Sequence, residues 1–234
     1  MATAGTPIGR RIVLGLLAAG ALGVVAGTRV QRGLEWALAP ILRGGSGLAG
    51  LLPVGRFRIY SVTGATPVRD RVTYRLTVDG FVDTPLQVTL DELEAMPPTE
   101  LVRDFQCVTG WRVPRVPWAG VRLADLLDRA GARPDAAAVR FHSFDGLYTE
   151  SLTMDQARRD DVLVAYEMEH HPLPSVHGGP VRLYVAPMYG YKSLKWLDRI
   201  EVTEGSAPPG YWAERGYDQD AWVGRSNGRD DAAT

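Results

Sequence analysis

The sequence predicts a mixed α+β fold, and three features carry this prediction. Residues 72–78 alternate apolar and polar side chains with a period of two, as a half-buried strand does. Residues 162–168 form a short apolar run that is typical of a buried strand. Residues 123–127 place their leucines on one face of a short helix. We therefore expect strands and short helices to share one core.

In the first half of the folded region, residues 56–62 predict a strand by their alternation. Thr89, followed three residues later by Glu92, predicts a capping box at the start of a helix. Residues 101–108 predict a strand that delivers Cys107 at its end, where a loop can open over a site.

In the second half, Pro117 predicts a turn that leads into a helix, and Gly131 predicts the end of that helix. The other expected elements are a strand and turn over 139–146, a helix over 154–159, a strand over 162–168, a turn over 169–174, a strand over 197–202 and a closing segment over 210–217.

The composition suits one globular domain and argues against a nucleic-acid partner. The chain has 234 residues and a net charge of −1. Residues 1–34 carry four arginines and no acidic residue, so removing these four charges leaves the rest of the chain at −5. A nucleic acid needs a basic face. The single cysteine excludes an intramolecular disulfide framework and any cysteine-rich zinc or iron–sulfur site.

The N-terminal segment resembles a twin-arginine export signal. Arg10 and Arg11 precede an uncharged run over 12–27, whose sixteen residues would make about 24 Å of helix. This length is short of the roughly 30 Å of a bilayer's hydrocarbon core. Both a cleaved signal and a retained anchor remain open, and either places the folded domain outside the cytoplasmic membrane. The expected organisation is a signal or anchor over 1–32, a linker over 33–55, a catalytic domain over 56–223 and a disordered tail over 224–234.

A stretch of glycines and basic residues over 177–196 predicts an anion site. It contains His177, Arg182 and the only two lysines of the chain, Lys192 and Lys195. Such groups on glycine-permitted backbone suit a buried phosphate. The alternative is a glycine-rich turn and strand with solvated charges.

Cys107 is the second candidate. A thiolate binds soft transition metals, although a lone cysteine is more often a small buried apolar residue.

Taken together, the two segments resemble the sulfite-oxidase-type molybdopterin family, and most closely its branch of methionine-sulfoxide reductase catalytic subunits. The resemblance runs from about residue 56 to residue 217 and rests on Phe105-Gln106-Cys107-Val108-Thr109-Gly110-Trp111, His177-Gly178-Gly179-Pro180-Val181-Arg182 and Gly190-Tyr191-Lys192-Ser193-Leu194-Lys195-Trp196. It implies a domain of several small sheets with peripheral helices.

The resemblance also implies a molybdenum–molybdopterin cofactor. Cys107 would be the metal ligand, and Tyr148 a proton donor near the metal, although a structural tyrosine is the alternative for that position. The residues that would bind the cofactor are Arg58, Tyr60, Ser61, Cys107, Ser143, Asp145, His177, Arg182, Gly190, Tyr191, Lys192 and Lys195.

The family implies two-electron oxygen-atom transfer. The sulfite oxidases carry Asn-Arg shortly after the cysteine, whereas this chain has Gly110-Trp111-Arg112, which favours a sulfoxide over sulfite as substrate. Oxidation of sulfite or another small anion is the alternative within the class, and a non-catalytic, membrane-tethered cofactor-binding domain is the alternative outside it. Electrons would come from a membrane-bound haem protein, and the chain would act as a monomeric catalytic subunit on a small sulfoxide or an oxidised protein.

Overall fold

The computed structural model describes residues 57–225. The predicted signal or anchor and the linker lie outside these residues, as does nearly all of the predicted tail. Within the described range, no helix has the length and apolar character needed to cross a membrane.

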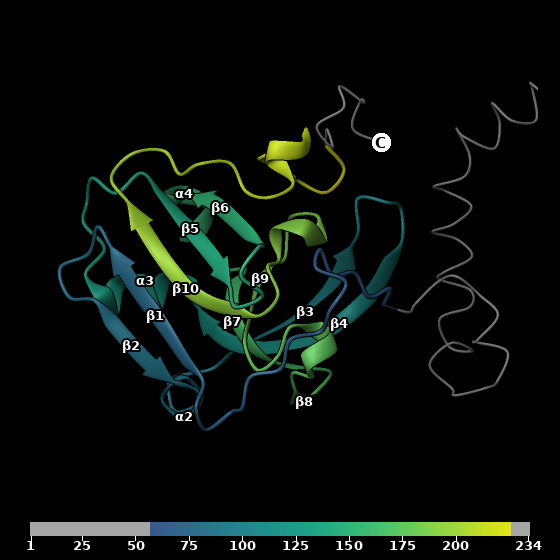
Figure 1. Ribbon diagram of the computed structural model, residues 1–234, viewed down its shortest axis with the longest axis horizontal. Helices are drawn as coiled ribbons and strands as arrows, with labels where there is room; N and C mark the ends of the chain where they lie inside the picture. Colours follow the sequence, from purple (N-terminus) through teal and green to yellow (C-terminus); the bar gives the residue numbers. More distant parts are fainter. Residues whose placement is uncertain (1–56, 226–234) are drawn as a thin grey trace, which may run out of the picture. The chain divides into compact units, whose positions relative to one another are not determined.

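The first sheet has five strands and mixed pairing (Figure 1). The strands β1 and β10 are parallel, and the other neighbours are antiparallel. In spatial order the strands are β2 (Leu86–Thr89), β1 (Arg75–Gly80), β10 (Leu197–Thr203), β5 (Ala138–Ser143) and β6 (Thr149–Thr153).

The second sheet is antiparallel and contains the long hairpin that carries the cysteine loop. Its strands are β3 (Thr99–Gln106), β4 (Arg112–Arg122), β7 (Val162–Met168) and β8 (His171–Pro172). Strand β9 (Arg182–Val185) also pairs with β7, on the same edge as β8 and opposite β4.

Strand β7 is buried on both faces, which explains its continuous apolar sequence. Val162 and Val164 pack into a large core that also contains residues of the first sheet. The alternate residues Leu163 and Ala165 pack into a second, aromatic-rich core with Trp118. The period of two along a strand therefore divides one strand between two cores.

The α-helices are short and lie at the ends of strands. They are α2 (Leu90–Glu94), α3 (Leu123–Ala130) and α4 (Met154–Ala157), and the 3-10 turns are η2 (Ser175–His177), η3 (Gly190–Lys192) and η4 (Ala213–Arg215). The predicted capping box at Thr89 is confirmed, because its side chain accepts from the Glu92 backbone while the Glu92 carboxylate accepts from the Thr89 backbone. The predicted helix end at Gly131 is also confirmed, since that residue is left-handed with φ +67°.

Two sequence-based expectations are wrong. Residues 57–61, within the expected strand 56–62, form no strand and run along a cavity instead. The expected turn at Pro117 lies inside the eleven-residue strand β4. This strand accommodates its prolines with a register shift opposite β3 and with Arg115 at φ +52°, whose N–H donates to Asp104.

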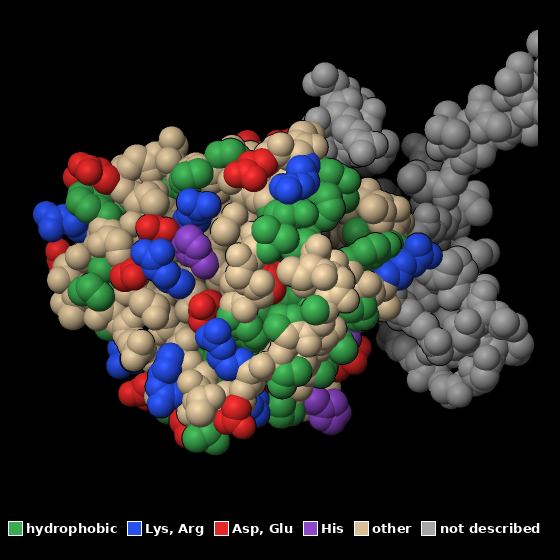
Figure 2. Space-filling model, viewed as in Figure 1, with side chains coloured by type: hydrophobic (Ala, Val, Ile, Leu, Met, Phe, Trp, Pro, Cys, Tyr) green, Lys and Arg blue, Asp and Glu red, His purple; other side chains and the backbone are tan. Residues whose placement is uncertain are grey.

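The outer face of the first sheet carries charged side chains of both signs. Arg199 binds Asp79 at 2.8 Å, and His142 lies 2.8 Å from Glu201. Figure 2 shows positive and negative side chains interspersed over this side of the molecule, with hydrophobic ones gathered elsewhere on the same face.

Candidate functional site

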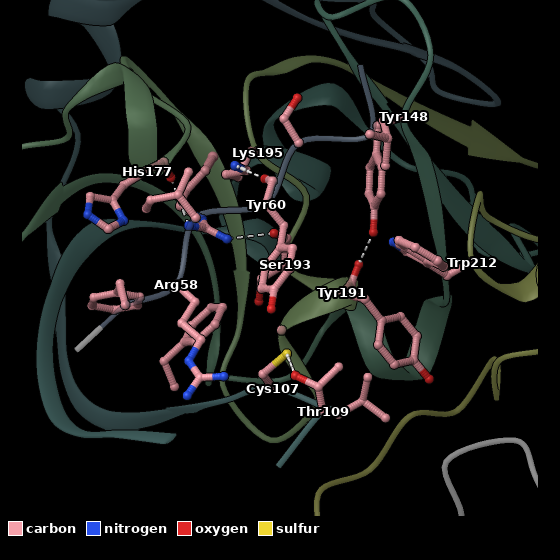
Figure 3. Close-up of a pocket in the computed structure, with 18 of the residues that line it drawn as sticks. Arg58, Tyr60, Cys107, Thr109, Tyr148, His177, Tyr191, Ser193, Lys195 and Trp212 are labelled. Atoms are coloured by element: carbon pink, nitrogen blue, oxygen red, sulfur yellow. Dashed lines mark hydrogen bonds between the residues drawn. The ribbon is translucent and has the colours of Figure 1, made fainter. Parts of the chain in front are cut away.

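A cavity of about 420 Å³ lies where the irregular segments between the strands converge. Its walls come from residues 57–62, the loop after β3, Tyr148, the segment around η2 and η3, and residues 211–217. In Figure 3, His177 and Lys195 lie on one side, Tyr148, Tyr191 and Trp212 on another, and Cys107 with Thr109 on a third.

Cys107 is held at the tip of the β3–β4 hairpin. Its N–H donates to the Trp111 carbonyl at 2.9 Å, and the Gly110 N–H donates to the Cys107 carbonyl at 3.1 Å. Gly110 has φ +94°, a conformation that favours glycine. The Cys107 side chain is partly exposed and lines the cavity, with Sγ 3.2 Å from Thr109 Oγ1. The thiol is therefore accessible to a ligand in the cavity.

Aromatic rings support the cavity beneath this loop. Phe105 stacks with Trp111 at 5.8 Å between ring centroids, and Phe57 contacts both rings. Gly190 packs so closely that an added Cβ would meet Phe105 Cζ at 2.4 Å. Only glycine fits there, so the backbone of η3 approaches the cavity wall directly.

Arg182 is the centre of the basic wall. The residue is 3% exposed and donates to three carbonyls: Leu183 at 3.2 Å, His177 at 2.8 Å and Ser193 at 2.6 Å. Its guanidinium also lies 5.6 Å from the centroid of Phe105. Burial lowers the pKa of Arg182 to about 10. The arginine thus joins the loops of η2 and η3 while remaining a costly buried charge.

His177 and Lys195 extend this wall. Burial, followed by repulsion from Arg182 and Lys195, lowers the pKa of His177 to about 4. Burial, followed by repulsion from Arg182, lowers the pKa of Lys195 to about 8, although Asp145 opposes this. Lys195 Nζ donates to the Tyr60 carbonyl. Among residues 57–225, no carboxylate forms an ion pair with His177, Arg182 or Lys195. The three groups together favour an anionic ligand.

Asp145 offers the cavity a hydrogen-bond acceptor. Its Oδ1 accepts from the N–H groups of Leu147 and Tyr148 at 2.9 and 2.8 Å, and its Oδ2 is buried without a hydrogen-bond partner. A buried unpartnered oxygen is rare and indicates a missing donor. Ser143 does not line the cavity; its hydroxyl accepts from the Asp145 N–H at 3.1 Å and thus supports the turn.

Tyr148 and Tyr191 form part of an aromatic wall. The Tyr148 hydroxyl donates to the Tyr191 carbonyl at 2.5 Å, and the Tyr191 hydroxyl donates to the Asp218 carbonyl at 2.6 Å. Burial, followed by the negative charge of Glu150, raises the pKa of Tyr148 well above its ordinary value. Tyr148 therefore stays protonated at neutral pH. The other aromatic residues of this wall are Tyr211, Trp212 and Tyr217.

The position of Lys192 contradicts its predicted contact with a phosphate. Its side chain is completely buried, does not line the cavity and binds Glu150 at 2.7 Å. A lysine this deeply buried requires an acceptor for its charge, and Glu150 supplies it. Arg112 also stays outside the cavity lining and pairs with Asp104 at 3.2 Å.

Apart from Lys192 and Ser143, the predicted cofactor-binding residues are brought together. Arg58, Tyr60, Ser61, Gly190 and Tyr191 line the cavity with Cys107, Asp145, His177, Arg182 and Lys195. Sequence reasoning assigned no role in the cavity to Phe57, Thr109, Val176, Ser193, Tyr211, Trp212 or Tyr217. The concentration of Tyr and Trp over 210–217 was the available signal, because these residue types are enriched at interfaces, but it does not say which surface they meet.

The cavity residues fit a molybdopterin cofactor. The basic wall lacks a counter-charge, as a phosphate site does before its ligand arrives, and the free Asp145 oxygen can accept from a pterin N–H. Cys107 provides the soft sulfur ligand that such a metal requires.

Comparison with known families matches residues 63–212 to the family described as "Oxidoreductase molybdopterin binding domain". The chain is 36% identical over 157 residues to "Uncharacterized oxidoreductase YuiH" of Bacillus subtilis, covering 66% of this chain and 78% of that protein. It is 32% identical over 154 residues to "Protein-methionine-sulfoxide reductase catalytic subunit MsrP" of Ralstonia nicotianae, covering 59% and 46%. It is 35% identical over 179 residues to "Sulfite oxidase, mitochondrial" of Rattus norvegicus, covering 64% and 33%.

A solved structure supports the fold. The sulfane dehydrogenase SoxCD of Paracoccus pantotrophus superposes with a TM-score of 0.56 at 23% identity, covering 60% of this chain and 40% of that one. The predicted α+β class, with mixed sheets and few helices, is thereby confirmed.

Proposed function

Because this chain belongs to the oxidoreductase molybdopterin-binding family, we propose that it reduces a sulfoxide by two-electron oxygen-atom transfer. The protein is an oxidoreductase, and its cofactor is the molybdenum cofactor. When bound, that cofactor supplies the transfer of one oxygen atom coupled to two electrons. In balanced form, a sulfoxide, two electrons and two protons give a thioether and water.

Different cavity residues would bind different parts of the cofactor. Cys107 would provide the thiolate ligand to the metal, Arg182 and Lys195 would neutralise the phosphate, and the neutral His177 would donate a hydrogen bond to it. Asp145 Oδ2 would accept from the pterin, where it now lacks a donor. The remaining contacts would come from Arg58, Tyr60, Ser61, Gly190 and Tyr191, which line the same cavity.

The observation that favours a sulfoxide is the uncharged aromatic wall. Tyr191, Trp212 and Tyr217 line the cavity, as does Trp111 in the cysteine loop. Figure 3 shows Tyr191 and Trp212 on the side away from His177. A neutral group with one polar oxygen and apolar substituents suits such rings better than a small dianion does. The MsrP relative, named as a protein-methionine-sulfoxide reductase, supports the same choice.

Tyr148 is our candidate for a proton donor. Its raised pKa keeps the hydroxyl protonated, and its proton is directed at the Tyr191 carbonyl. Donation to a substrate oxygen would require this hydrogen bond to exchange, which a hydroxyl does by rotation about its C–O bond.

Oxidation of sulfite or another small anion is the second candidate, and Arg58 favours it. This arginine lines the cavity and can provide a cation for an anionic substrate. The relative named as a sulfite oxidase supports this alternative.

The decisive experiment assays the molybdenum-loaded protein with methionine sulfoxide and with sulfite in parallel. We expect turnover of the sulfoxide; turnover of sulfite alone would reverse the assignment. Molybdenum without turnover of either substrate would favour a non-catalytic cofactor-binding domain. The Cys107→Ser variant should keep the wild-type melting temperature and lose turnover, and full turnover in that variant would refute the ligand role of Cys107.

We further propose that a membrane-bound haem protein supplies the electrons and that the domain works outside the cytoplasmic membrane. The support is the MsrP relative and the arginine-led apolar segment over 12–27. Fractionation of cells that express the full chain tests the location, and recovery of folded, loaded protein only from the cytoplasm would contradict it.

A further inference from the structure

A buried ion pair lies behind the aromatic wall of the cavity. The side chains of Lys192 and Glu150 are 0% and 1% exposed, and Lys192 Nζ lies 2.7 Å from Glu150 Oε1. Neither side chain lines the cavity. The pair joins two distant parts of the chain, the turn η3 and the strand β6.

The hydrogen bonds of this pair reach a third segment. Lys192 Nζ also donates to the Ser151 carbonyl at 2.6 Å, and the Ser151 N–H donates to Glu150 Oε1 at 2.8 Å. The Ser151 hydroxyl donates to the Pro208 carbonyl at 2.6 Å. The backbone of Gly210 lies against the carboxylate, because a side chain there would meet Glu150 Oε1 at 2.5 Å. The pair and its hydrogen bonds thus connect β6, η3 and residues 208–210.

Each of these three segments contributes to the cavity wall. Tyr148 immediately precedes β6, Tyr191 belongs to η3, and Tyr211 follows Gly210. Tyr148 contacts the other two tyrosines. Its hydroxyl donates to the Tyr191 carbonyl at 2.5 Å, and its ring stacks on that of Tyr211 with 5.5 Å between the centroids. The Tyr211 N–H donates to the Thr149 carbonyl at 2.9 Å, beside Glu150.

Stability alone does not explain a buried ion pair at these two positions. Removing two charges from water costs more than many ion pairs return, and well-packed apolar residues of similar size often stabilise a protein more. Glu150 Oε2 even remains without a hydrogen-bond partner. What a buried charged pair can add is conformational specificity, because each charge is costly in any arrangement in which it does not meet its partner.

We propose that Glu150 and Lys192 are positioning residues, which hold the aromatic wall and the η3 backbone in the arrangement that receives the cofactor. This role depends on the proposed function, because the wall they arrange belongs to the cofactor cavity. The pair acts through Tyr148, Gly190, Tyr191 and Tyr211 and touches neither cofactor nor substrate.

The test separates positioning from simple stabilisation. The double variant Glu150→Leu/Lys192→Met replaces both charges by apolar side chains, so the buried-charge penalty disappears. Glu150→Gln keeps the shape and one acceptor for Lys192 but removes the negative charge. Arg158→Met is the matched control, because it breaks the surface pair of Arg158 with Asp128 (2.7 Å), and neither residue lines the cavity. The measurements are melting temperature, molybdenum per folded chain and the near-ultraviolet circular dichroism of the metal-free protein.

We expect the double variant to melt near the wild-type temperature and to retain about tenfold less molybdenum, as when a supporting contact behind a metal site is lost. Its tyrosine circular dichroism should change, since Tyr148 no longer stacks on Tyr211 in the same way. Arg158→Met should match the wild type in all three measurements.

Wild-type molybdenum content and circular dichroism in a folded double variant would overturn the proposal. If the double variant does not fold, Glu150→Gln decides by the same two measurements. A wild-type chain that binds no molybdenum would refute the proposed function instead, and the circular dichroism of the metal-free variants would still decide the positioning role.

Discussion

Two lysines three residues apart occupy opposite electrostatic surroundings. Lys192 is completely buried and binds the carboxylate of Glu150 and the Ser151 carbonyl. Lys195 stands at the cavity with Arg182 and His177 nearby, and its own hydrogen bond goes to the Tyr60 carbonyl. Burial therefore produces a compensated charge in one place and an uncompensated one in the other.

The difference distinguishes a charge that is paired within the fold from charges that are available to a bound anion. A compensated pair costs the empty protein little, and removing one partner leaves the other charge unpaired in a low dielectric. A cluster of like charges raises the free energy of the empty protein and lowers it only when an anion arrives. We call these the ion-pair region (Glu150, Lys192) and the basic wall (His177, Arg182, Lys195).

The largest expected effect comes from breaking the ion-pair region on one side. Lys192→Met leaves Glu150 buried without its cation and should lower the free energy of unfolding by about 3–5 kcal/mol, the usual result for such a pair. Urea unfolding of the metal-free protein measures this. The surface variant Arg158→Met should cost no more than about 1 kcal/mol. A loss below that of the control would erase the distinction between the two regions.

A smaller loss is expected at the border of the two regions, where both Glu150 and Arg182 act on Tyr148. Tyr148→Phe leaves the Tyr191 carbonyl without its donor, so the free energy of unfolding should fall by about 1–3 kcal/mol. If Tyr148 donates a proton, kcat for the sulfoxide should fall while KM changes little. An unchanged kcat would leave Tyr148 with a structural role, which was the alternative from the sequence.

The sequence predicted those parts of the molecule that depend on local patterns. Alternation located β1, a further expected strand coincides with β10, and the capping pair located α2. Strand β4 was missed because its prolines and Gly120 are turn signals, whereas β3 and β7 on its two sides impose the extended form. Tertiary pairing overrode local preference there.

The sequence predicted only part of the cavity lining, because only some of its residues belong to local patterns. Cys107 at the end of a strand and the basic stretch around Arg182 can be read from spacing, and both line the cavity. Lys192 was misassigned because its partner, Glu150, is 42 positions away and no local pattern reveals it. The wall residues Trp212 and Tyr217 depend on how residues 211–217 fold back toward Tyr148, a long-range contact that one sequence does not disclose.

Removing a charge from the basic wall should not lower the free energy of unfolding, in contrast to breaking the Glu150–Lys192 pair. In Lys195→Met, the free energy of unfolding of the metal-free protein should equal or exceed that of the wild type, because burial and Arg182 already disfavour the ammonium. Affinity for sulfate, an anion of constant charge, should fall about tenfold, or about 1.4 kcal/mol. Isothermal titration measures the affinity and urea unfolding the stability. A clear destabilisation with unchanged sulfate binding would place Lys195 with the structural charges.

The smallest expected effect is the pH dependence of the same sulfate affinity. The pKa of Lys195 in the empty protein is about 8, below its ordinary value, so the ammonium loses its proton as the pH rises from 7 to 9. Sulfate stabilises the charged form, and binding must then take up a proton. Affinity should therefore be highest below pH 8 and fall several-fold by pH 9, within the tenfold limit set by Lys195→Met.

Two variants sharpen this measurement. The titrations are made in a Cys107→Ser background, which removes the only thiol of the chain from the site and leaves Lys195 as the group of interest. Lys195→Arg keeps its charge to much higher pH and should flatten the profile. His177, with a pKa of about 4, is neutral throughout and adds no slope. A flat profile between pH 7 and 9 in the Cys107→Ser chain that retains Lys195 would show that the Lys195 ammonium is compensated after all, and the contrast with Lys192 would then disappear.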